Sequence, residues 1–552
     1  MRPSVRIGVL FIVALALALL GSHPSTAAAG GLRFQAKPPI WEVDDTAPID
    51  EPQVRDWNRY HSYIDGYWLR PLDDILGLHT GHPALDINSV EGVPASSWFT
   101  PRVGHLDLSA ADVGQGAVSH PALAERGTYP VLAARVDGPE PFLLIAEDEE
   151  RQCRLILDDP AYPEMRTAAT VIAARLLHAC GYNVFESFID HIRPEQLVLA
   201  EDAEERERYG GTGDLDQKEL DALIARLAPE GGRLRVAVCR LPEGTPKGGF
   251  PERGVRGDDP NDQIPHQDRR SLRGLRVFSS WIGLTRMRTD RTLDVYLDDG
   301  RYLRHYLYRL GMSLGARVQS PHPFGTESEE SYWAMGVWLG NLFQFGFGKS
   351  YQTHPPAARF PGVGEFAARG FDPVSWAPAY RYEPFARMAW GDAFWAADIV
   401  SSFTSEQIRA AVAAGELSDP QAEAYLRGTL IERRDRLAAG WLAEINAACD
   451  FEILRPSQNR WLLSFDDRGV TAGAMLPEDT QYVMAFSLPE LNELLGEQAR
   501  GGHYLEFDLS HFVPPPHLHR NDPRRYGVAS LRAYSYRGRL RSGVCHVHIY
   551  FD

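Results

Sequence analysis

The 552-residue chain is acidic, with a formal charge of −17, and contains five cysteines. An acidic chain is a poor match for nucleic acid or an anionic lipid surface, so neither is expected as a partner. Five cysteines without a C-x-x-C pair indicate neither a disulfide scaffold nor a zinc site, and the length allows two or three domains.

The chain begins with the pattern of a secretory signal peptide. Two arginines precede the apolar run Ile7–Leu20, and Ala27–Ala29 fits an A-x-A cleavage site before Gly30. The run is shorter than the roughly 20 residues of a membrane span, which makes an uncleaved anchor the weaker alternative. Residues 1–29 are therefore expected to be removed and the rest exported to the periplasm or the extracellular space, without a membrane span.

The next part of the chain predicts an irregular extension followed by a sheet with helices. The stretch from Gly31 to about Val103 is rich in Pro, Asp and Trp and has little periodicity, so an irregular extension is expected over residues 30–125. Strands are expected at Pro130–Val136, Phe142–Ala146, Cys153–Leu157, Val184–Ile189 and Leu234–Arg240. Apolar residues recur at helical spacing over Met165–Cys180, and Gly181 stands where a C-cap would. A charged amphipathic helix is expected over Asp214–Leu227.

The remainder of the chain predicts a helical block and then a β-rich end. After the breaker-rich segment Pro242–Pro265, a helix is expected at Arg269–Leu284. A hairpin is expected from Leu293–Leu297 and Tyr302–Tyr308 around an Asp-Asp-Gly turn. Helices are expected again over Asp392–Cys449, one starting at the capping box Thr404–Gln407 and another at Asp419 with Pro420 in its first turn. Short strands with Pro and Gly turns over 450–552 predict a small β-rich domain.

Four strings of residues carry a resemblance to a protein family. They are Asp159–Glu164, Cys180–Val184, Asp258–Phe278 and Tyr302–Leu307, within a region that runs from Ser96 to Trp441. On these residues the chain resembles a large group of uncharacterised exported bacterial proteins with a protein-kinase-like fold. The resemblance implies an α+β fold with a two-lobed kinase-like domain. Its β-rich N-lobe would cover 126–245 and its helical C-lobe 246–449, and the irregular extension and the β-rich domain would flank it.

The resemblance also locates the residues that phosphoryl transfer would need. A kinase uses a Lys on the third strand, a Glu on the following helix, a catalytic Asp, a metal-binding Asn and a metal-binding Asp. The resemblance places these five functions, in this order, at Ile156, Thr170, Arg286, Arg291 and Arg309. All five residues are changed, no Asn has an Asp five positions before it, and no D-F-G occurs. The resemblance therefore implies a catalytically inactive pseudokinase without a cofactor, and Asp290 or Asp294 remains as an alternative, displaced base.

Three of the five changes introduce arginine. Arg286, Arg291 and Arg309 would converge on the space that normally holds Mg²⁺ and the γ-phosphate, where three positive charges exclude a divalent cation. They would instead bind a phosphate, sulfate, carboxylate or acidic sugar through their planar guanidinium groups. In the alternative, they point outward or pair with local acids such as Asp290, Asp294, Asp298 and Asp299.

No other motif predicts a site. His517, His519, His546 and His548 form two pairs without an evident third metal ligand. Asp258–Asp262 is expected to be a turn with helix-capping acids rather than a Ca²⁺ loop. Gly346–Ser350 looks like the end of a P-loop but lacks its first Gly, and no G-x-S-x-G hydrolase motif is present.

The sequence thus predicts an exported pseudokinase-like module that binds a small anion or a protein partner in the cell envelope. Two alternatives stay open. One is an atypical phosphotransferase or nucleotidyl transferase with a rearranged site, and the other is a purely structural envelope protein.

Overall fold

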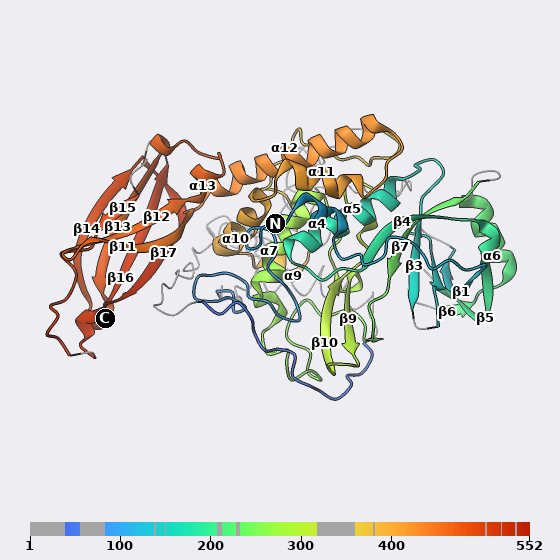
Figure 1. Cartoon of the computed structure of the whole chain (residues 1–552), viewed down its shortest axis with the longest axis horizontal. Coiled ribbons are helices and arrows are strands. Elements are labelled where there is room, and N and C mark those ends of the chain that lie inside the picture. Colours follow the sequence, from blue (N-terminus) through green and yellow to red (C-terminus); the bar gives the residue numbers. More distant parts are fainter. Residues whose placement is uncertain are drawn as a thin grey trace, which may run out of the picture.

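The computed structural model describes residues 39–55, 83–136, 140–149, 151–206, 212–227, 232–316, 359–378, 381–502, 505–519, 521–535 and 538–551. The predicted signal peptide and the Gly346–Ser350 segment lie outside these residues. The chain is a mixed α+β protein with three regions in a row: a sheet with helices, a helical centre and a β-rich C-terminal domain (Figure 1).

The first region is a seven-stranded sheet of order β4-β7-β3-β2-β1-β5-β6. The sequence predicted five of its strands, which are β1 (Tyr129–Arg135), β2 (Phe142–Ala146), β3 (Gln152–Leu157), β4 (Glu186–Ile192) and β7 (Leu234–Arg240). It missed β5 (Leu197–Arg206), which pairs parallel to β1, and β6 (Thr212–Asp214). β6 forms the edge of the sheet and β5 lies beside it. The second half of β5 and all of β6 are polar and largely exposed, so they show little apolar alternation to detect.

Each face of this sheet packs on a different part of the chain. On β3, Leu155 contributes to a core with Leu220 and Leu223 of α6 (Gln217–Leu227), whereas the next residue, Ile156, points to the opposite core. α6 starts at Gln217 rather than at the predicted Asp214, because Thr212–Asp214 form β6 instead.

The helix α5 (Met165–Cys180) lies between the sheet and the helical centre and is buried along almost its whole length. It ends as predicted at Gly181, whose φ of 127° suits glycine and whose N–H donates to the carbonyl of His178.

Six helices of the described residues form the helical centre. They are α4 (Ala110–Gln115), α7 (Arg270–Ile282), α9 (Glu383–Ala386), α10 (Trp390–Ser401), α11 (Ser405–Ala413) and α12 (Pro420–Glu444). The predicted N-termini are confirmed for α11, where Thr404 and Gln407 form a capping box, and for α12, where Asp419 is the N-cap. A three-stranded sheet, β10-β9-β8, lies beside them and contains β8 (Thr245–Pro246) and the predicted hairpin of β9 (Thr292–Leu297) and β10 (Tyr302–Leu307).

The N-terminus of α7 is capped by the irregular extension and not by the acids that the sequence predicted. The backbone N–H groups of Arg270 and Ser271, at the start of α7, donate to Asp86 in the extension. The expected capping role of Asp258–Asp262 is therefore wrong. Instead, the Asp262 carboxylate binds the side chains of His266, at 2.7 Å, and Arg269, at 2.9 Å.

The C-terminal domain consists of two packed sheets. One has the order β11-β12-β15 and contains β11 (Ala448–Ser457), β12 (Arg460–Asp467) and β15 (Glu506–Asp508). The other has the order β14-β13-β16-β17 and contains β13 (Thr480–Leu488), β14 (Glu493–Gly501), β16 (Tyr526–Ser535) and β17 (Arg539–Tyr550). A short helix, α13 (Arg468–Thr471), follows β12, and the domain begins at Ala448, slightly before the predicted boundary. Within the described ranges, no helix has the length and apolar character needed to cross a membrane.

Candidate functional site

The structure brings together four of the five positions that the family resemblance singles out, which are Ile156, Thr170, Arg291 and Arg309. Ile156 lies on β3, the third strand of the chain, and Thr170 lies on α5, the helix that follows it. Thr170 Oγ1 donates to the carbonyl of Arg166 at 2.8 Å. Gly311, which follows Arg309 by two residues, packs on Thr170 and Ile156, so the segment after β10 meets β3 and α5 at one place.

Arg291 and Arg309 lie side by side at this place and share one carboxylate. Arg291 donates from Nη2 to one oxygen of Glu140 at 2.8 Å, and Arg309 binds the other oxygen of Glu140. Arg291 also donates from Nη1 to the main-chain carbonyl of Arg309. Arg309 adopts a left-handed backbone, with φ of 58°, so the chain turns sharply where this guanidinium enters the cluster.

Glu140 comes from the connection between β1 and β2 and is buried. Burial alone would raise the pKa of its carboxyl, but Arg291, Arg309 and Arg166 outweigh it and hold that pKa well below its usual range. Glu140 therefore stays ionised and partly neutralises the arginine pair. An anion from solvent would have to displace this carboxylate.

Arg286 is half-buried in the loop after α7 and is in contact with another group. The two alternative bases are also engaged. Asp290 has a side chain only 11% exposed and binds Arg288 and Arg309, each at 2.9 Å. Burial would raise the pKa of Asp290, but Arg288, Arg309 and Arg291 lower it. Asp294 is fully buried between Arg256, at 2.8 Å, and His305, at 2.7 Å.

Little space remains around Arg309. A cavity of about 20 Å³ lies there, and its walls include Arg154, Ile156, Thr170 and Tyr308. A single water needs roughly 10–15 Å³ of such space, and small-molecule sites have volumes of about 300–1,000 Å³. The cavity therefore has room for about one water molecule and none for a nucleotide.

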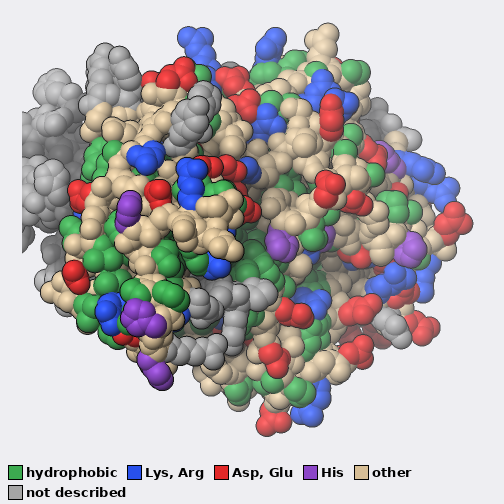
Figure 2. All heavy atoms as spheres, turned by 60° about the vertical axis from the view of Figure 1, so that its left-hand side comes forward, with side chains coloured by type: hydrophobic (Ala, Val, Ile, Leu, Met, Phe, Trp, Pro, Cys, Tyr) green, Lys and Arg blue, Asp and Glu red, His purple; other side chains and the backbone are tan. Residues whose placement is uncertain are grey.

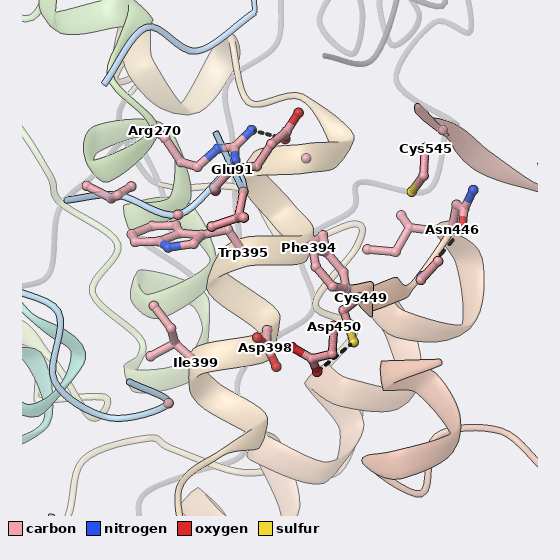
Figure 3. Close-up of a pocket in the computed structure, with 18 of the residues that line it drawn as sticks. Glu91, Arg270, Phe394, Trp395, Asp398, Ile399, Asn446, Cys449, Asp450 and Cys545 are labelled. Atoms are coloured by element: carbon pink, nitrogen blue, oxygen red, sulfur yellow. Dashed lines mark hydrogen bonds and ion pairs between the residues drawn. The ribbon is translucent and has the colours of Figure 1, made fainter. Parts of the chain in front are cut away.

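A much larger pocket lies between the helical centre and the C-terminal domain, with a volume of about 580 Å³. In the space-filling view, the surface is hollowed near the middle of the face shown, and hydrophobic side chains lie deep in this hollow (Figure 2). The walls come from the extension, from α10, and from β11 and β17 (Figure 3). The walls include the side chains of Trp41, Glu91, Arg270, Trp390, Phe394, Trp395, Asp398, Cys449, Asp450, Phe451, Glu452 and Cys545.

The two cysteines of this pocket are not reactive thiolates. Cys449 donates through Sγ to Asp450 Oδ2 at 3.4 Å, and its pKa is raised by burial and then by the charge of Asp450. Burial, followed by the charge of Glu91, raises the pKa of Cys545 to about 12. Because the thiolate is the nucleophilic form, neither side chain is suited to covalent catalysis at neutral pH.

Two features distinguish the acidic residues of the pocket: one is ion-paired and has a raised pKa, and two have a left-handed backbone. Asp398 pairs with Arg468 and is still 38% exposed. Burial raises its pKa against the opposing effect of Arg468, and the charge of Asp450 raises it further. Glu91 and Asp450 both have left-handed backbones, with φ of 58° and 51°. Such conformations cost of order 1–3 kcal/mol for a residue other than glycine and cluster at functional sites.

Sequence reasoning missed this pocket because its walls come from segments that are hundreds of residues apart. The one local signal was the group of aromatic residues around Trp390 and Trp395. In this part of the chain, helices were predicted only from Asp392 onward, and these partly buried rings were given no role. The described residues contain no group of three or more His, Cys, Asp or Glu side chains placed to bind a metal. No protein-family model matches this chain, and no curated protein matches its sequence.

Proposed function

We propose that this chain is an exported, kinase-like binding protein that does not transfer phosphoryl groups. The observation that carries the proposal is the carboxylate of Glu140, which binds Arg291 and Arg309 at positions where the family resemblance expects metal ligands. An internal salt-bridged cluster thus stands at the positions that the resemblance assigns to the Mg²⁺ ligands of a kinase.

The arrangement of elements supports the kinase-like part of the proposal. A sheet contributes its third strand, β3, and the following helix, α5, to a junction with a helical region that contains the hairpin of β9 and β10. Ile156, Thr170 and Arg309 meet at this junction, where the resemblance would bring the phosphate Lys, its Glu partner and the metal Asp together.

The chemistry of the junction argues against the alternative of an atypical phosphotransferase. Asp290, the nearest candidate for a displaced base, has a lowered pKa and is bound by two arginines, so it is a weak proton acceptor. A divalent cation beside Arg291 and Arg309 would be repelled.

Binding is assigned to the pocket of about 580 Å³ between the helical centre and the C-terminal domain. Its volume lies within the range of small-molecule sites, and its walls combine aromatic rings with a few carboxylates, as such sites usually do. The proposal therefore moves the ligand from the arginine cluster, which already holds a carboxylate, to this pocket.

The test is an assay for phosphoryl and nucleotidyl transfer by the purified protein with labelled ATP and Mg²⁺ or Mn²⁺. No metal-dependent labelling is expected from wild type. Labelling that Asp290→Asn abolishes and Asp299→Asn leaves intact would establish the rearranged enzyme instead. Asp299 is a suitable control because it is an exposed carboxylate in the β9–β10 turn.

Export is part of the proposal and has its own test. The apolar run and the small residues Ala27–Ala29 place the mature N-terminus near Gly30. N-terminal sequencing of protein recovered outside the cytoplasm is expected to start there, and exported protein that still starts at Met1 would contradict this.

A further inference from the structure

The large pocket carries more negative than positive charge. Its walls contain four carboxylates, those of Glu91, Asp398, Asp450 and Glu452. The one arginine in the walls, Arg270, is already paired with Glu91 at 2.9 Å and with Asp392 at 3.0 Å. Among the described residues, no Lys or Arg forms an ion pair with Asp450 or Glu452, so their charges remain available to a ligand.

Two further observations show that the pocket favours positive charge. The oxygen Oε1 of Glu91 is buried and accepts no hydrogen bond, although its other oxygen binds Arg270. The pKa values of Asp398 and Cys545 are raised by burial and also by the nearby charges of Asp450 and Glu91. A positive charge placed in the pocket would relieve this repulsion, whereas an anion would increase it.

Aromatic rings form much of the rest of the wall. Trp41, Trp390, Phe394, Trp395 and Phe451 all line the pocket and are only partly buried. Several are held in place by neighbouring rings: Trp395 packs on Phe99 with ring centroids 5.3 Å apart, and Trp390 packs on Trp441 at 6.1 Å. In Figure 3 both Phe394 and Trp395 project from α10, Phe394 toward Cys449 and Trp395 on the side of Arg270.

Aromatic faces and carboxylates together select one class of small molecule. A ring attracts a cation through its quadrupole, and rings combined with acids recognise quaternary ammonium groups. Apolar substituents on such a cation also gain from contact with the ring faces.

We propose that this pocket binds an organic cation, a quaternary ammonium or protonated amine with apolar substituents. The inference rests on the proposed function, which assigns the ligand to the pocket rather than to the arginine cluster. It goes further by naming the charge and the chemical class of that ligand.

The experiment is a calorimetric titration of the full protein with four probes. They are benzyltrimethylammonium, choline, the uncharged choline isostere 3,3-dimethylbutan-1-ol, and benzoate as an aromatic anion. The two cations are expected to bind saturably, and choline is expected to bind about tenfold more tightly than its isostere because only the cation gains the charge and ring attraction. Benzoate is expected not to bind.

Matched variants locate the site. Asp450→Asn removes one charge and keeps a residue that tolerates the left-handed backbone, so it should fold and weaken cation binding about fivefold. Phe394→Leu removes a ring while keeping an apolar side chain and should weaken binding similarly, whereas Phe394→Tyr should retain it. Asp299→Asn, in the distant hairpin turn, should leave the affinity unchanged.

The outcomes separate this inference from the proposed function. If no cation binds, or if choline and its isostere bind equally, the inference fails. If benzoate binds and Phe394→Leu weakens it, the pocket is a ligand site but not for cations, so the proposed function stands while the inference fails. A separate titration with ATP and Mg²⁺ completes the set: if this is the only saturable binding and the pocket variants do not affect it, both fail.

Discussion

Glu140 and Arg291 form a buried ion pair of 2.8 Å although 151 residues separate them in the chain. The pair joins the turn between β1 and β2 to the loop before β9, and Arg309 binds the same carboxylate from the end of β10. The N-terminal sheet and the hairpin are therefore connected through one acidic side chain.

Replacing this acid should destabilise the folded chain. Glu140→Gln leaves Arg291 and Arg309 without their shared charge, and removing one partner of a buried pair costs about 3–5 kcal/mol. Urea unfolding of wild type and variant would measure the loss. Glu149→Gln, a change of the same kind at an exposed position nearby, should alter the free energy of unfolding by less than about 0.5 kcal/mol. Equal effects of the two changes would contradict the role given to Glu140.

The same carboxylate predicts a pH dependence of stability. Burial would raise the pKa of Glu140, but the arginines depress it well below its usual range. A depressed folded-state pKa contributes stability that is fully present above the unfolded pKa, about 4.3, and is lost as the pH falls. The difference in unfolding free energy between wild type and Glu140→Gln should therefore be constant at neutral pH and shrink in acid. A difference that stays constant or widens as the pH falls from 7 to about 3 would rule this out.

Gly181 should tolerate no side chain. A Cβ at this position would stand 2.3 Å from the ring of Phe99, and φ is 127°. Gly370 has φ of 85° but nothing within 4 Å, so Gly370→Ala would report the cost of the backbone alone. Gly181→Ala should therefore cost about 1–3 kcal/mol more than Gly370→Ala, the usual penalty of overpacking. Thermal unfolding of the two variants measures this difference, and equal losses would mean that the Phe99 ring moves aside without cost.

A buried pair should hold the C-terminal domain against α12. Asp467 binds Arg541 at 2.8 Å and accepts a hydrogen bond from Tyr482, while Arg541 also donates to the carbonyl of Leu442 on α12. Asp467→Asn should cost about 3–5 kcal/mol because it leaves a buried guanidinium without its charge partner. Its neighbour Asp466 is exposed, so Asp466→Asn serves as the control. Limited proteolysis near Ala448 is therefore expected to become faster in Asp467→Asn than in Asp466→Asn. An equal increase in both variants would contradict this role.

Local patterns in the sequence were sufficient for most of the secondary structure. The bounds predicted for α5, β2 and β7 agree with the structure, because each has strong periodicity or a continuous apolar run between clear breakers. The capping box at Thr404 and the hairpin turn were also predicted correctly, because capping and turn formation involve residues only a few positions apart. The β-rich C-terminal domain followed from short strands and their turns.

Tertiary structure alone decided which side chains meet. The family resemblance pointed to Arg291 and Arg309, but their partner Glu140 lies far away in the chain and no local pattern marks it. Burial of Asp294 likewise depends on Arg256 and His305, which come from other segments. The large pocket forms only where the extension, α10 and the C-terminal sheets pack together. Charge neutralisation and enclosed space depend on distances through the fold, whereas the sequence encodes directly only the conformations of neighbouring residues.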